Sequence, residues 1–439
     1  MTKLGRMLIR TAAVLAVAGW GAQTGWAQEL KARADRADGV YAAGQTVVFR
    51  VEIANAPAGD ATAASYVLRK GQFTDIGRGT LTLAGGSGTV TSSLPEPGTI
   101  LFEAKAKSKG RELKALAGAV FAPEKIAPSA PPPDDFDAFW AAKIKELSAA
   151  PMNPVLEPGD SGKKDVEYAK ITLDGFRGTK IHGQLARPKN GKPKAALLIV
   201  QWAGVYPLEK GWVTGPAAEG FLALNLEAHD LPIDAPASFY EEQKNGPLKD
   251  YPAIGNDSRE TSYFLRMYLS AYRAADYLMQ CKDWNGKDLA VTGGSQGGLQ
   301  TLMLAGLHPK ITAAMADVPA GCDHTGAAAG RAPGWPQWNS KTDGKDKAKV
   351  LEASRYYDVV NFAAHIRCPA LVGTGLIDQT CPAAGVLAAC NAIPGPHEVV
   401  IMPLSAHQAV GNTQAAFYAR QSAWHQAILA GRPLPPAKP

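Results

Sequence analysis

Short, uninterrupted apolar runs recur through the second half of the chain and constrain its fold more than any other feature. They lie at 195–202, 221–226, 289–292, 313–318, 370–374 and 399–403. A strand without polar alternation needs apolar cover on both faces, as in a parallel sheet between two helical layers. Helical stretches separate the runs, and residues 263–278 carry their apolar side chains on one face. The sequence therefore predicts an α/β fold with a doubly wound, mostly parallel sheet, preceded by an antiparallel hairpin at 166–187.

The region before this sheet has a different pattern. Residues 47–53 alternate apolar and polar side chains, which is typical of a strand with one buried face. Similar runs, separated by Gly and Pro, follow at 65–69, 80–83, 99–106 and 113–121. They predict a small all-β sandwich of immunoglobulin-like type over residues 28–121. The prolines of 122–134 predict an extended linker, so the α/β domain is expected over 135–434, opening with a helix at 136–147.

The first 27 residues have the pattern of an export signal. Lys3, Arg6 and Arg10 precede a short apolar stretch at 11–22, and small residues then predict cleavage after about Ala27. A membrane anchor is the alternative, but this stretch is too short to span about 30 Å of hydrocarbon. The mature protein is expected to be secreted or periplasmic and not held in a membrane.

The charge balance gives no support to a nucleic-acid partner. The chain has 46 Lys and Arg against 40 Asp and Glu, a net charge of +6. Three of the basic residues belong to the expected signal, and 43 against 40 leaves +3. The composition of 46% hydrophobic and 20% charged residues is that of a globular protein.

Five cysteines lie in the C-terminal half, so at least one is unpaired within a monomer. Their spacing gives neither the disulfide pairing nor a structural zinc site. They are Cys281, Cys322, Cys368, Cys381 and Cys390.

A strand-to-helix junction carries the strongest chemical motif. Residues 293–297 read Gly-Gly-Ser-Gln-Gly, between an apolar strand and a helical stretch. In the G-x-S-x-G turn the serine adopts a strained conformation that exposes its hydroxyl at the sheet edge. Ser295 is therefore the predicted nucleophile, and a glycine-rich turn without chemistry is the alternative.

An acid and a histidine follow in the order that this turn requires. Asp378 comes just after the run at 370–374, and His407 just after the run at 399–403. Both fall beyond carboxyl ends of predicted parallel strands, where open α/β sheets place their ligands. We expect His407 to take the proton of Ser295 and Asp378 to orient the imidazole.

Other titratable residues compete for these roles. Asp317 ends the strand after the serine turn, and we expect it to be structural. His397 precedes its strand and so lies at the wrong end of the sheet, whereas His324 is either an alternative base or part of a pocket wall. The remaining histidines lack motif support; they are His182, His229, His308, His365 and His425.

A serine that attacks a carbonyl needs backbone N–H groups to stabilise the oxyanion. One donor should be Gln296, the residue after the nucleophile. The second should come from the loop that follows the first central strand, with Val205 favoured and Gly204 as the alternative.

Four segments resemble the acetyl xylan esterase / cephalosporin C deacetylase family, carbohydrate esterase family seven. They are Asp135-Phe136-Asp137-Ala138-Phe139-Trp140, the helix at 263–278 with Arg266, Tyr268 and Arg273, the serine turn at 292–298, and Asp378-Gln379-Thr380-Cys381-Pro382 followed by Asn391. The resemblance covers about residues 134–430. It implies an α/β-hydrolase that removes O-acetyl groups from xylo-oligosaccharides and similar small esters, without a metal or other cofactor.

The chain departs from the family pattern at several positions. Ala203-Gly204-Val205 stands where the family has His-Gly-Tyr, and Glu227-Ala228-His229 stands where it has Arg-Gly-Gln, a motif that holds the site loops together. Gln408 replaces the Glu that usually follows the histidine. The N-terminal β domain is absent from minimal members and could block the interfaces of the family's hexamer, so the oligomeric state stays open.

We therefore expect a secreted serine carboxylic-ester hydrolase whose partner is an acetylated oligosaccharide or another small ester. A serine peptidase of prolyl-oligopeptidase type and a non-catalytic glycan-binding protein with a vestigial site are the alternatives. Trp335 and Trp338, in a segment rich in Gly and Pro, either stack on sugar rings or pack the loop. Trp202 is either a substrate contact or part of the core.

Overall fold

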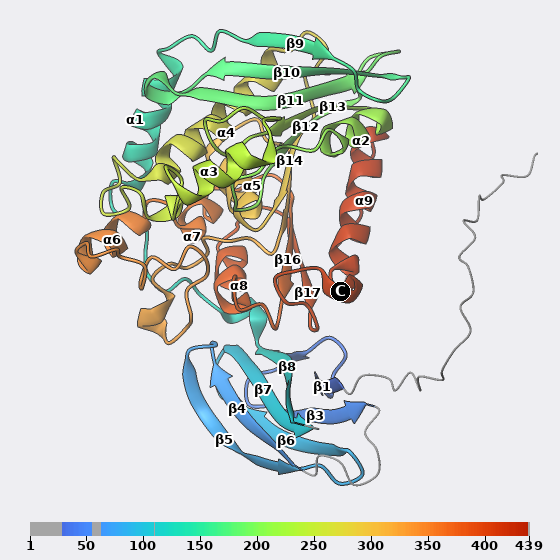
Figure 1. The fold of residues 1–439 in the computed structure, drawn as a ribbon, viewed down its shortest axis with the longest axis vertical. Coiled ribbons are helices and arrows are strands. Elements are labelled where there is room, and N and C mark those ends of the chain that lie inside the picture. Colours follow the sequence, from blue (N-terminus) through green and yellow to red (C-terminus); the bar gives the residue numbers. More distant parts are fainter. Residues whose placement is uncertain (1–28, 55–62, 109, 438–439) are drawn as a thin grey trace, which may run out of the picture.

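The computed structural model describes residues 29–54, 63–108 and 110–437, so the expected export signal lies outside the described residues. These residues form two parts that follow one another along the chain (Figure 1). Residues 29–121, here called the N-terminal β region, form two small sheets. Residues 136–429 form a large sheet between helices.

The N-terminal β region is all-β, as the sequence predicts. Its strands are β1 (Glu29–Ala34), β2 (Val40–Tyr41), β3 (Thr46–Ala54), β4 (Ala63–Lys70), β5 (Thr74–Thr82), β6 (Ser87–Ser93), β7 (Gly98–Ser108) and β8 (Arg111–Phe121). One sheet has the order β1-β3-β6 and the other the order β2-β8-β7-β4-β5. The alternating side chains of β3 bury Val47, Phe49 and Val51 completely. Phe49 stacks on Phe102 of the other sheet at 5.0 Å, so the two sheets share one apolar core.

The second part is built on a nine-stranded sheet. Its strands are β9 (Val155–Gly159), β10 (Val166–Asp174), β11 (Lys180–Pro188), β12 (Ala195–Val200), β13 (Phe221–Leu226), β14 (Leu289–Gly294), β15 (Ala313–Asp317), β16 (Ala370–Gly375) and β17 (His397–Met402). The order is β17-β16-β15-β14-β12-β13-β11-β10-β9. The six strands from β17 to β13 run parallel, and the last three are antiparallel. The doubly wound, mostly parallel sheet is therefore confirmed.

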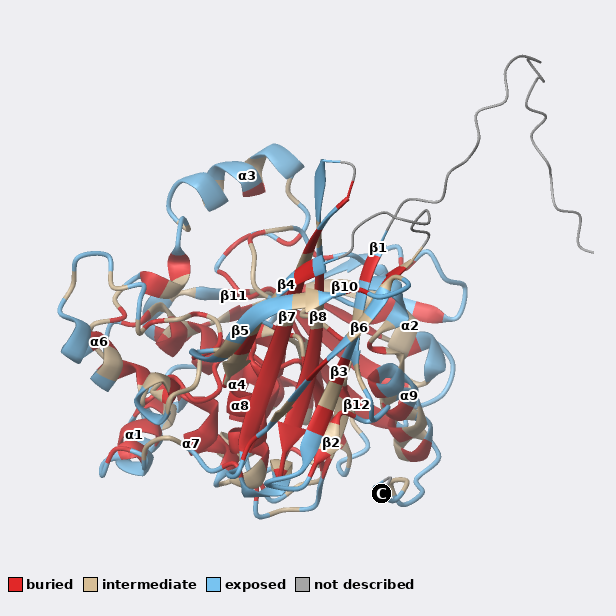
Figure 2. Cartoon of the chain, turned by 90° about the horizontal axis from the view of Figure 1, so that it is seen from below, coloured by how far each residue is buried: buried red, intermediate tan, exposed pale blue. Residues whose placement is uncertain are grey.

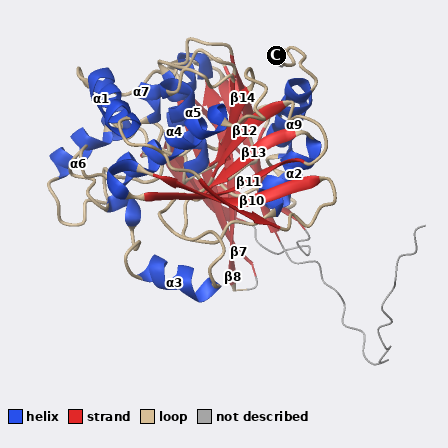
Figure 3. Ribbon diagram, turned by 90° about the horizontal axis from the view of Figure 1, so that it is seen from above, coloured by secondary structure: helices blue, strands red, loops and turns tan. Residues whose placement is uncertain are grey.

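Helices cover both faces of this sheet (Figures 1 and 3). One layer contains α1 (Phe136–Ser148), α4 (Tyr263–Gln280), α5 (Gln296–Leu307), α7 (Val359–Ala363) and α8 (Ala383–Asn391). The other contains α2 (Gly211–Glu219) and α9 (Ala415–Leu429). Because both faces are covered, β13 is buried at all six positions, which explains its unbroken apolar sequence. Two further helices, α3 (Ala237–Asn245) and α6 (Lys347–Ser354), lie outside these layers, and α3 is mostly exposed (Figure 2).

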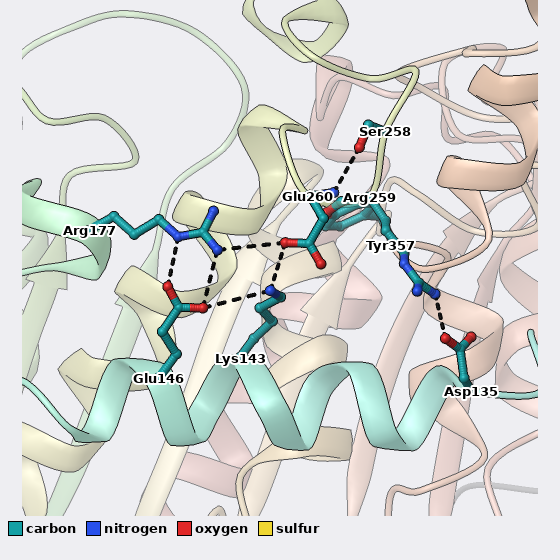
Figure 4. A network of polar contacts seen from close by, with 8 residues as sticks. All are labelled: Asp135, Lys143, Glu146, Arg177, Ser258, Arg259, Glu260 and Tyr357. Carbon is teal, nitrogen blue, oxygen red and sulfur yellow. Dashed lines mark hydrogen bonds and ion pairs between the residues drawn. The ribbon is translucent and has the colours of Figure 1, made fainter.

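Charged side chains attach α1 to its neighbours (Figure 4). Asp135 lies at the N-cap position without a capping hydrogen bond, and its carboxylate instead pairs with Arg259 at 2.6 Å. Lys143 pairs with Glu260 at 2.6 Å, and Arg177 approaches the same carboxylate at 3.6 Å. Each pair has at least one partner that is more than a third exposed, and such pairs contribute up to about 1 kcal/mol, so they direct the docking of α1 more than they stabilise it.

Two further observations concern helices that could cross a membrane and the state of the cysteines. Among the described residues, no helix combines the length and the apolar character that a membrane crossing requires. All five cysteines are free thiols, and Cys322, Cys381 and Cys390 are buried.

Candidate active site

Ser295 lies at the sharp turn between β14 and α5. Its backbone has φ 56° and ψ −120°, a strained conformation for a residue with a side chain. The neighbouring glycines allow this turn to approach β12, because a Cβ on Gly293 would lie 2.6 Å from the Val200 carbonyl oxygen and one on Gly297 only 2.3 Å from it. The glycines of the motif are therefore required by the close packing of backbone on backbone.

His407 lies in the loop after β17 and contacts both of its predicted partners. Its Nε2 is 2.9 Å from the hydroxyl oxygen of Ser295, and its Nδ1 is 2.8 Å from a carboxylate oxygen of Asp378. The carboxylate can only accept, so Nδ1 carries the proton and Nε2 is free to accept from the serine. Three side chains that span 113 positions of the chain thus form one hydrogen-bonded line.

Asp378 is fully buried in the loop after β16. One carboxylate oxygen accepts the backbone N–H groups of Thr380 and Cys381, each at 2.8 Å. The other oxygen accepts from His407. With both oxygens engaged, the carboxylate has one orientation, and that orientation sets the plane of the imidazole.

The backbone of His407 is held from α9. The Gln414 side chain, which is buried, donates to the carbonyl of His407 at 3.2 Å and to that of Ala406 at 3.4 Å. No sequence pattern indicated this role, because Gln414 lies in no recognised motif.

In the part of the chain that the structure describes, the two backbone N–H groups predicted as oxyanion donors are not engaged by other groups. Within the described residues, neither the N–H of Gln296 nor that of Val205 has an acceptor. Gly204 is less suited, because its backbone also interacts with the hydroxyl of Tyr251. The side chain of Val205 is buried against Leu231, which fixes the loop.

A buried histidine that the sequence analysis set aside holds this loop. His229 Nε2 is 2.8 Å from the carbonyl oxygen of Gly204, and its Nδ1 is 2.6 Å from the hydroxyl of Tyr263. A carbonyl only accepts, so Nε2 carries the proton and Nδ1 accepts from Tyr263. His229 occupies the last position of the segment aligned with the Arg-Gly-Gln motif, which was the available signal for its role.

Burial determines the charge state around His229. Burial lowers the pKa of His229 to about 4 and raises the pKa of Glu227 to about 8. A Glu227 carboxylate oxygen accepts the backbone N–H of His229 at 3.2 Å. At neutral pH the histidine is uncharged, as its two hydrogen bonds require.

The serine turn is also linked through side chains to the loop of residues 201–205, here called the Val205 loop. The Tyr251 hydroxyl donates to the side-chain oxygen of Gln296, and the Gln296 amide donates to the backbone of Gln201 at 3.4 Å. Gln296 therefore lies between the nucleophile and the strand end from which the loop begins.

Among the described residues, the competing acid and histidines make no side-chain hydrogen bond to Ser295. Asp317 is buried at the end of β15, where its carbonyl accepts the Ser295 N–H at 2.9 Å and burial raises its side-chain pKa to about 7. His397 begins β17, at the opposite end of that strand from His407. His324 is buried, stacks on Trp338 at 5.2 Å and has no hydrogen-bond partner for either ring nitrogen among the described residues.

The predicted tryptophans differ in exposure. Trp338 is 1% exposed and donates to the Pro252 carbonyl at 2.8 Å, so of its two predicted alternatives the burial favours loop packing over stacking on a sugar. Trp335 is partly buried, 5.8 Å from the ring of Phe264. Trp202 is 46% exposed and rests on Tyr206 at 5.3 Å, so the prediction that it belongs to the core does not hold.

Among the described residues, one group of three metal-ligating side chains comes together: Asp378, Cys381 and His407, with ligand atoms within 4.8 Å of one another. The Asp378 and His407 atoms already bond each other and the serine, and burial raises the pKa of the Cys381 thiol. This donor set suits proton transfer better than metal binding.

A cavity of about 980 Å³ lies away from these three side chains, beside β9 and β10.

The doubly wound sheet, with a serine at this strand–turn–helix junction, defines the α/β-hydrolase class. Residues 124–426 match the model of the acetyl xylan esterase family AXE1, and the chain belongs to this family. It is accordingly a carboxylic-ester hydrolase.

Individual relatives agree with this assignment. The chain is 34% identical over 303 residues to acetyl esterase Axe7A of Xylanibacter ruminicola, covering 67% of each chain. An acetyl xylan esterase from Paenibacillus sp. R4 superposes with a TM-score of 0.60 at 22% identity, over 70% of this chain and 98% of that one. Acetyl xylan esterase 1 from Thermoanaerobacterium sp. JW/SL YS485 gives 0.59 at 19% identity, over 70% and 97%. These structures share the fold.

Proposed function

We propose that this protein removes O-acetyl groups from acetylated xylo-oligosaccharides and similar small esters, through an acyl-enzyme formed at Ser295. The carrying observation is that His407 hydrogen-bonds both the Ser295 hydroxyl and the Asp378 carboxylate. The acetyl esterase among its relatives and the acetyl xylan esterases that share its fold support acetate as the acyl group and xylan fragments as the substrate.

In the first half of the reaction, the Ser295 oxygen bonds to the acetyl carbonyl carbon while its proton moves to Nε2 of His407. Asp378 stabilises the imidazolium through Nδ1. The carbonyl oxygen becomes an oxyanion that accepts the N–H groups of Gln296 and Val205. The bond to the sugar oxygen then breaks, and this oxygen takes the proton from His407 as the alcohol leaves.

In the second half, a water molecule gives a proton to Nε2 of His407 and attacks the acetyl carbon. The second oxyanion uses the same two N–H groups. The bond to Ser295 breaks, the serine oxygen recovers its proton from His407, and acetate is released. The site returns to its starting state without a cofactor.

Trp202 is our candidate for contact with the sugar. Its ring is exposed, stacks on Tyr206 and meets the edge of Trp212 at 4.9 Å, so it is held before substrate arrives. It begins the loop that carries Val205, which brings a sugar stacked on it near the predicted oxyanion donors. A held aromatic face binds a sugar ring at little cost in side-chain entropy.

We further propose that residues 1–27 direct export, with cleavage after about Ala27. In this proposal residues 28–121 form an immunoglobulin-like domain, 122–134 a linker and 135–434 the catalytic domain. The separate apolar core of the N-terminal β region supports that division. Fractionation of expressing cells with N-terminal sequencing of the product tests it, and a cytoplasmic chain that retains Met1 would contradict export.

The decisive experiment compares wild type, Ser295→Ala and the exposed-serine control Ser422→Ala. Each is assayed with acetylated xylo-oligosaccharides, a chromogenic acetate ester and a panel of peptide amides. We expect wild type and Ser422→Ala to release acetate and to bind a fluorophosphonate covalently, and Ser295→Ala to do neither. Equal esterase activity in all three proteins, or hydrolysis of the peptide amides alone, would contradict the proposal.

A further inference from the structure

The N-terminal β region reaches the loop of the catalytic acid. The turn between β4 and β5 carries Gln72, whose side-chain amide donates to the backbone carbonyl of Asp378 at 2.8 Å. Gln72 has φ 57°, a left-handed conformation that a residue with a side chain adopts at a cost. The two residues are 306 positions apart, so the turn is held against a segment from a distant part of the chain.

A second route joins the same turn to the acid. The Gly71 carbonyl accepts the N–H of Ala332 at 2.8 Å, and Trp335, three residues on, donates its N–H to the Thr380 carbonyl at 2.7 Å. The N–H of Thr380 is one of the two that hold the Asp378 carboxylate. The segment from Ala332 to Trp335 thus lies between the turn and the loop after β16 that carries Asp378, here called the acid loop, and contacts both.

Close packing accompanies these bonds. Leu376, two residues before the acid, is 2% exposed. A Cβ on Gly118 of β8 would lie 2.5 Å from both the Cβ and the carbonyl oxygen of Leu376, and one on Gly39 would lie 2.7 Å from its Cδ1. Strand β8 is therefore as near to the acid loop as a backbone without a side chain allows.

We propose that the N-terminal β region is part of the catalytic apparatus, and that Gln72 is a positioning residue for Asp378. This rests on the proposed function, since it assigns Asp378 the role of orienting His407. The carboxylate is fixed by its own loop, and Gln72 and Gly118 fix that loop from outside. Loss of this contact lets the acid loop shift, which slows the chemical step and leaves the binding of a small ester unchanged.

Gln72→Ala and Gln72→Glu test the hydrogen bond, with Gln45→Ala as the matched control. Gln45 accepts from the Ala42 N–H within the N-terminal β region, so its loss costs a comparable bond away from the acid loop. We expect kcat per fluorophosphonate-titrated site on a chromogenic acetate ester to fall about three- to tenfold in Gln72→Ala, with KM unchanged. Gln72→Glu should fall further, because a carboxylate not only cannot donate but also repels the Asp378 carbonyl oxygen. Gln45→Ala should match wild type.

Gly118→Ala tests the packing independently of Gln72. Gly98→Ala is its control, since a Cβ there meets only the flexible end of Leu94 at 3.4 Å. We expect a lower kcat per titrated site in Gly118→Ala only. If both Gln72→Ala and Gly118→Ala keep the wild-type kcat per site, this inference is wrong although the esterase assignment stands. If wild type hydrolyses no ester, or Ser295→Ala equals it, the proposed function itself fails.

Discussion

The loop that carries Asp378, here called the acid side, and the loop that carries Val205, here called the oxyanion side after its predicted role, are held in different ways. On the acid side, Asp378 is fixed by the N–H groups of Thr380 and Cys381, within the motif that resembles the family. On the oxyanion side, the Val205 loop departs from the family pattern and is held by His229, which belongs to another strand end. The comparison teaches that the Asp378 carboxylate is oriented within its own loop, which Gln72 in turn contacts from the N-terminal β region, whereas the Val205 loop depends on a side chain from another strand end.

The largest expected effect is on the acid side. Asp378→Asn should lower kcat by about 10³- to 10⁴-fold with little change in KM, because the amide disfavours the tautomer of His407 that accepts from Ser295. Steady-state kinetics on a chromogenic acetate ester measures it. Asp317→Asn is the comparison variant, and a large loss there with near wild-type activity in Asp378→Asn would mean that the two acids have been assigned the wrong way round.

On the oxyanion side, His229→Phe should lower kcat by about 10- to 100-fold, less than direct removal of an oxyanion donor costs. The phenyl ring cannot donate to the Gly204 carbonyl, so the loop loses its anchor. His229→Gln keeps a donor and should retain more activity. His425→Phe, a partly buried histidine beside Phe221, serves as the control. Equal rates in His229→Phe and His229→Gln would show that the hydrogen bond to the Gly204 carbonyl is not what holds the loop.

The oxyanion side should also respond to pH. The pKa of Glu227 is raised from 4.5 to about 8, so its contribution to stability is complete below pH 4.5 and is lost as the pH rises through 8. The side chain of Glu227→Gln cannot ionise, so this variant does not lose stability at high pH for this reason. We expect its thermal midpoint, relative to wild type, to be higher at pH 8.5 than at pH 5. A constant difference between the two proteins over this range would show that Glu227 does not titrate there.

His229 should act in the opposite sense. Its pKa is lowered from 6.5 to about 4, so its contribution to stability is complete above pH 6.5 and is lost as the pH falls through 4. Relative to wild type, His229→Phe should therefore lose less stability between pH 7 and pH 4. Thermal unfolding at both values measures it, and parallel losses in the two proteins would refute the burial argument.

The smallest expected effect concerns the substrate. Trp202→Ala should raise KM for an acetylated xylo-oligosaccharide by about three- to tenfold, the range expected from loss of one aromatic contact. KM for a chromogenic acetate ester should stay at the wild-type value, because that substrate has no sugar ring to stack. An equal rise for both substrates would indicate disturbance of the Val205 loop instead of a lost sugar contact.

Much of the fold was predictable because strands that are buried on both faces have continuous apolar sequences. The run at 221–226 coincides with β13, and the helix expected at 136–147 ends one residue later in α1. The strand β9 was missed because all five of its residues are exposed, so it has no apolar face to detect. In β6, the single buried side chain, Val90, is too weak a signal.

The site was predictable where chain order and strand ends determine it. Ser295, Asp378 and His407 each follow a strand in the order that the serine turn requires. The role of Gln72 could not be read from sequence, because it depends on a contact between distant segments. For His229 the signal was its place in the segment aligned with the Arg-Gly-Gln motif, which did not reveal its contact with Gly204. For Trp338 the sequence left loop packing and sugar stacking both open, because its Gly- and Pro-rich surroundings do not show that Phe264 packs against its ring at 5.0 Å.

The contact of Gly118 with Leu376 has a consequence for anyone who shortens this chain. Cutting in the proline-rich segment would leave a fragment the size of a minimal esterase, but it would expose Leu376 to water beside the acid. The fragment would gain an apolar patch at its rim and would be prone to aggregate or to lose turnover. The β sandwich therefore has to be kept when the enzyme is trimmed, fused or immobilised.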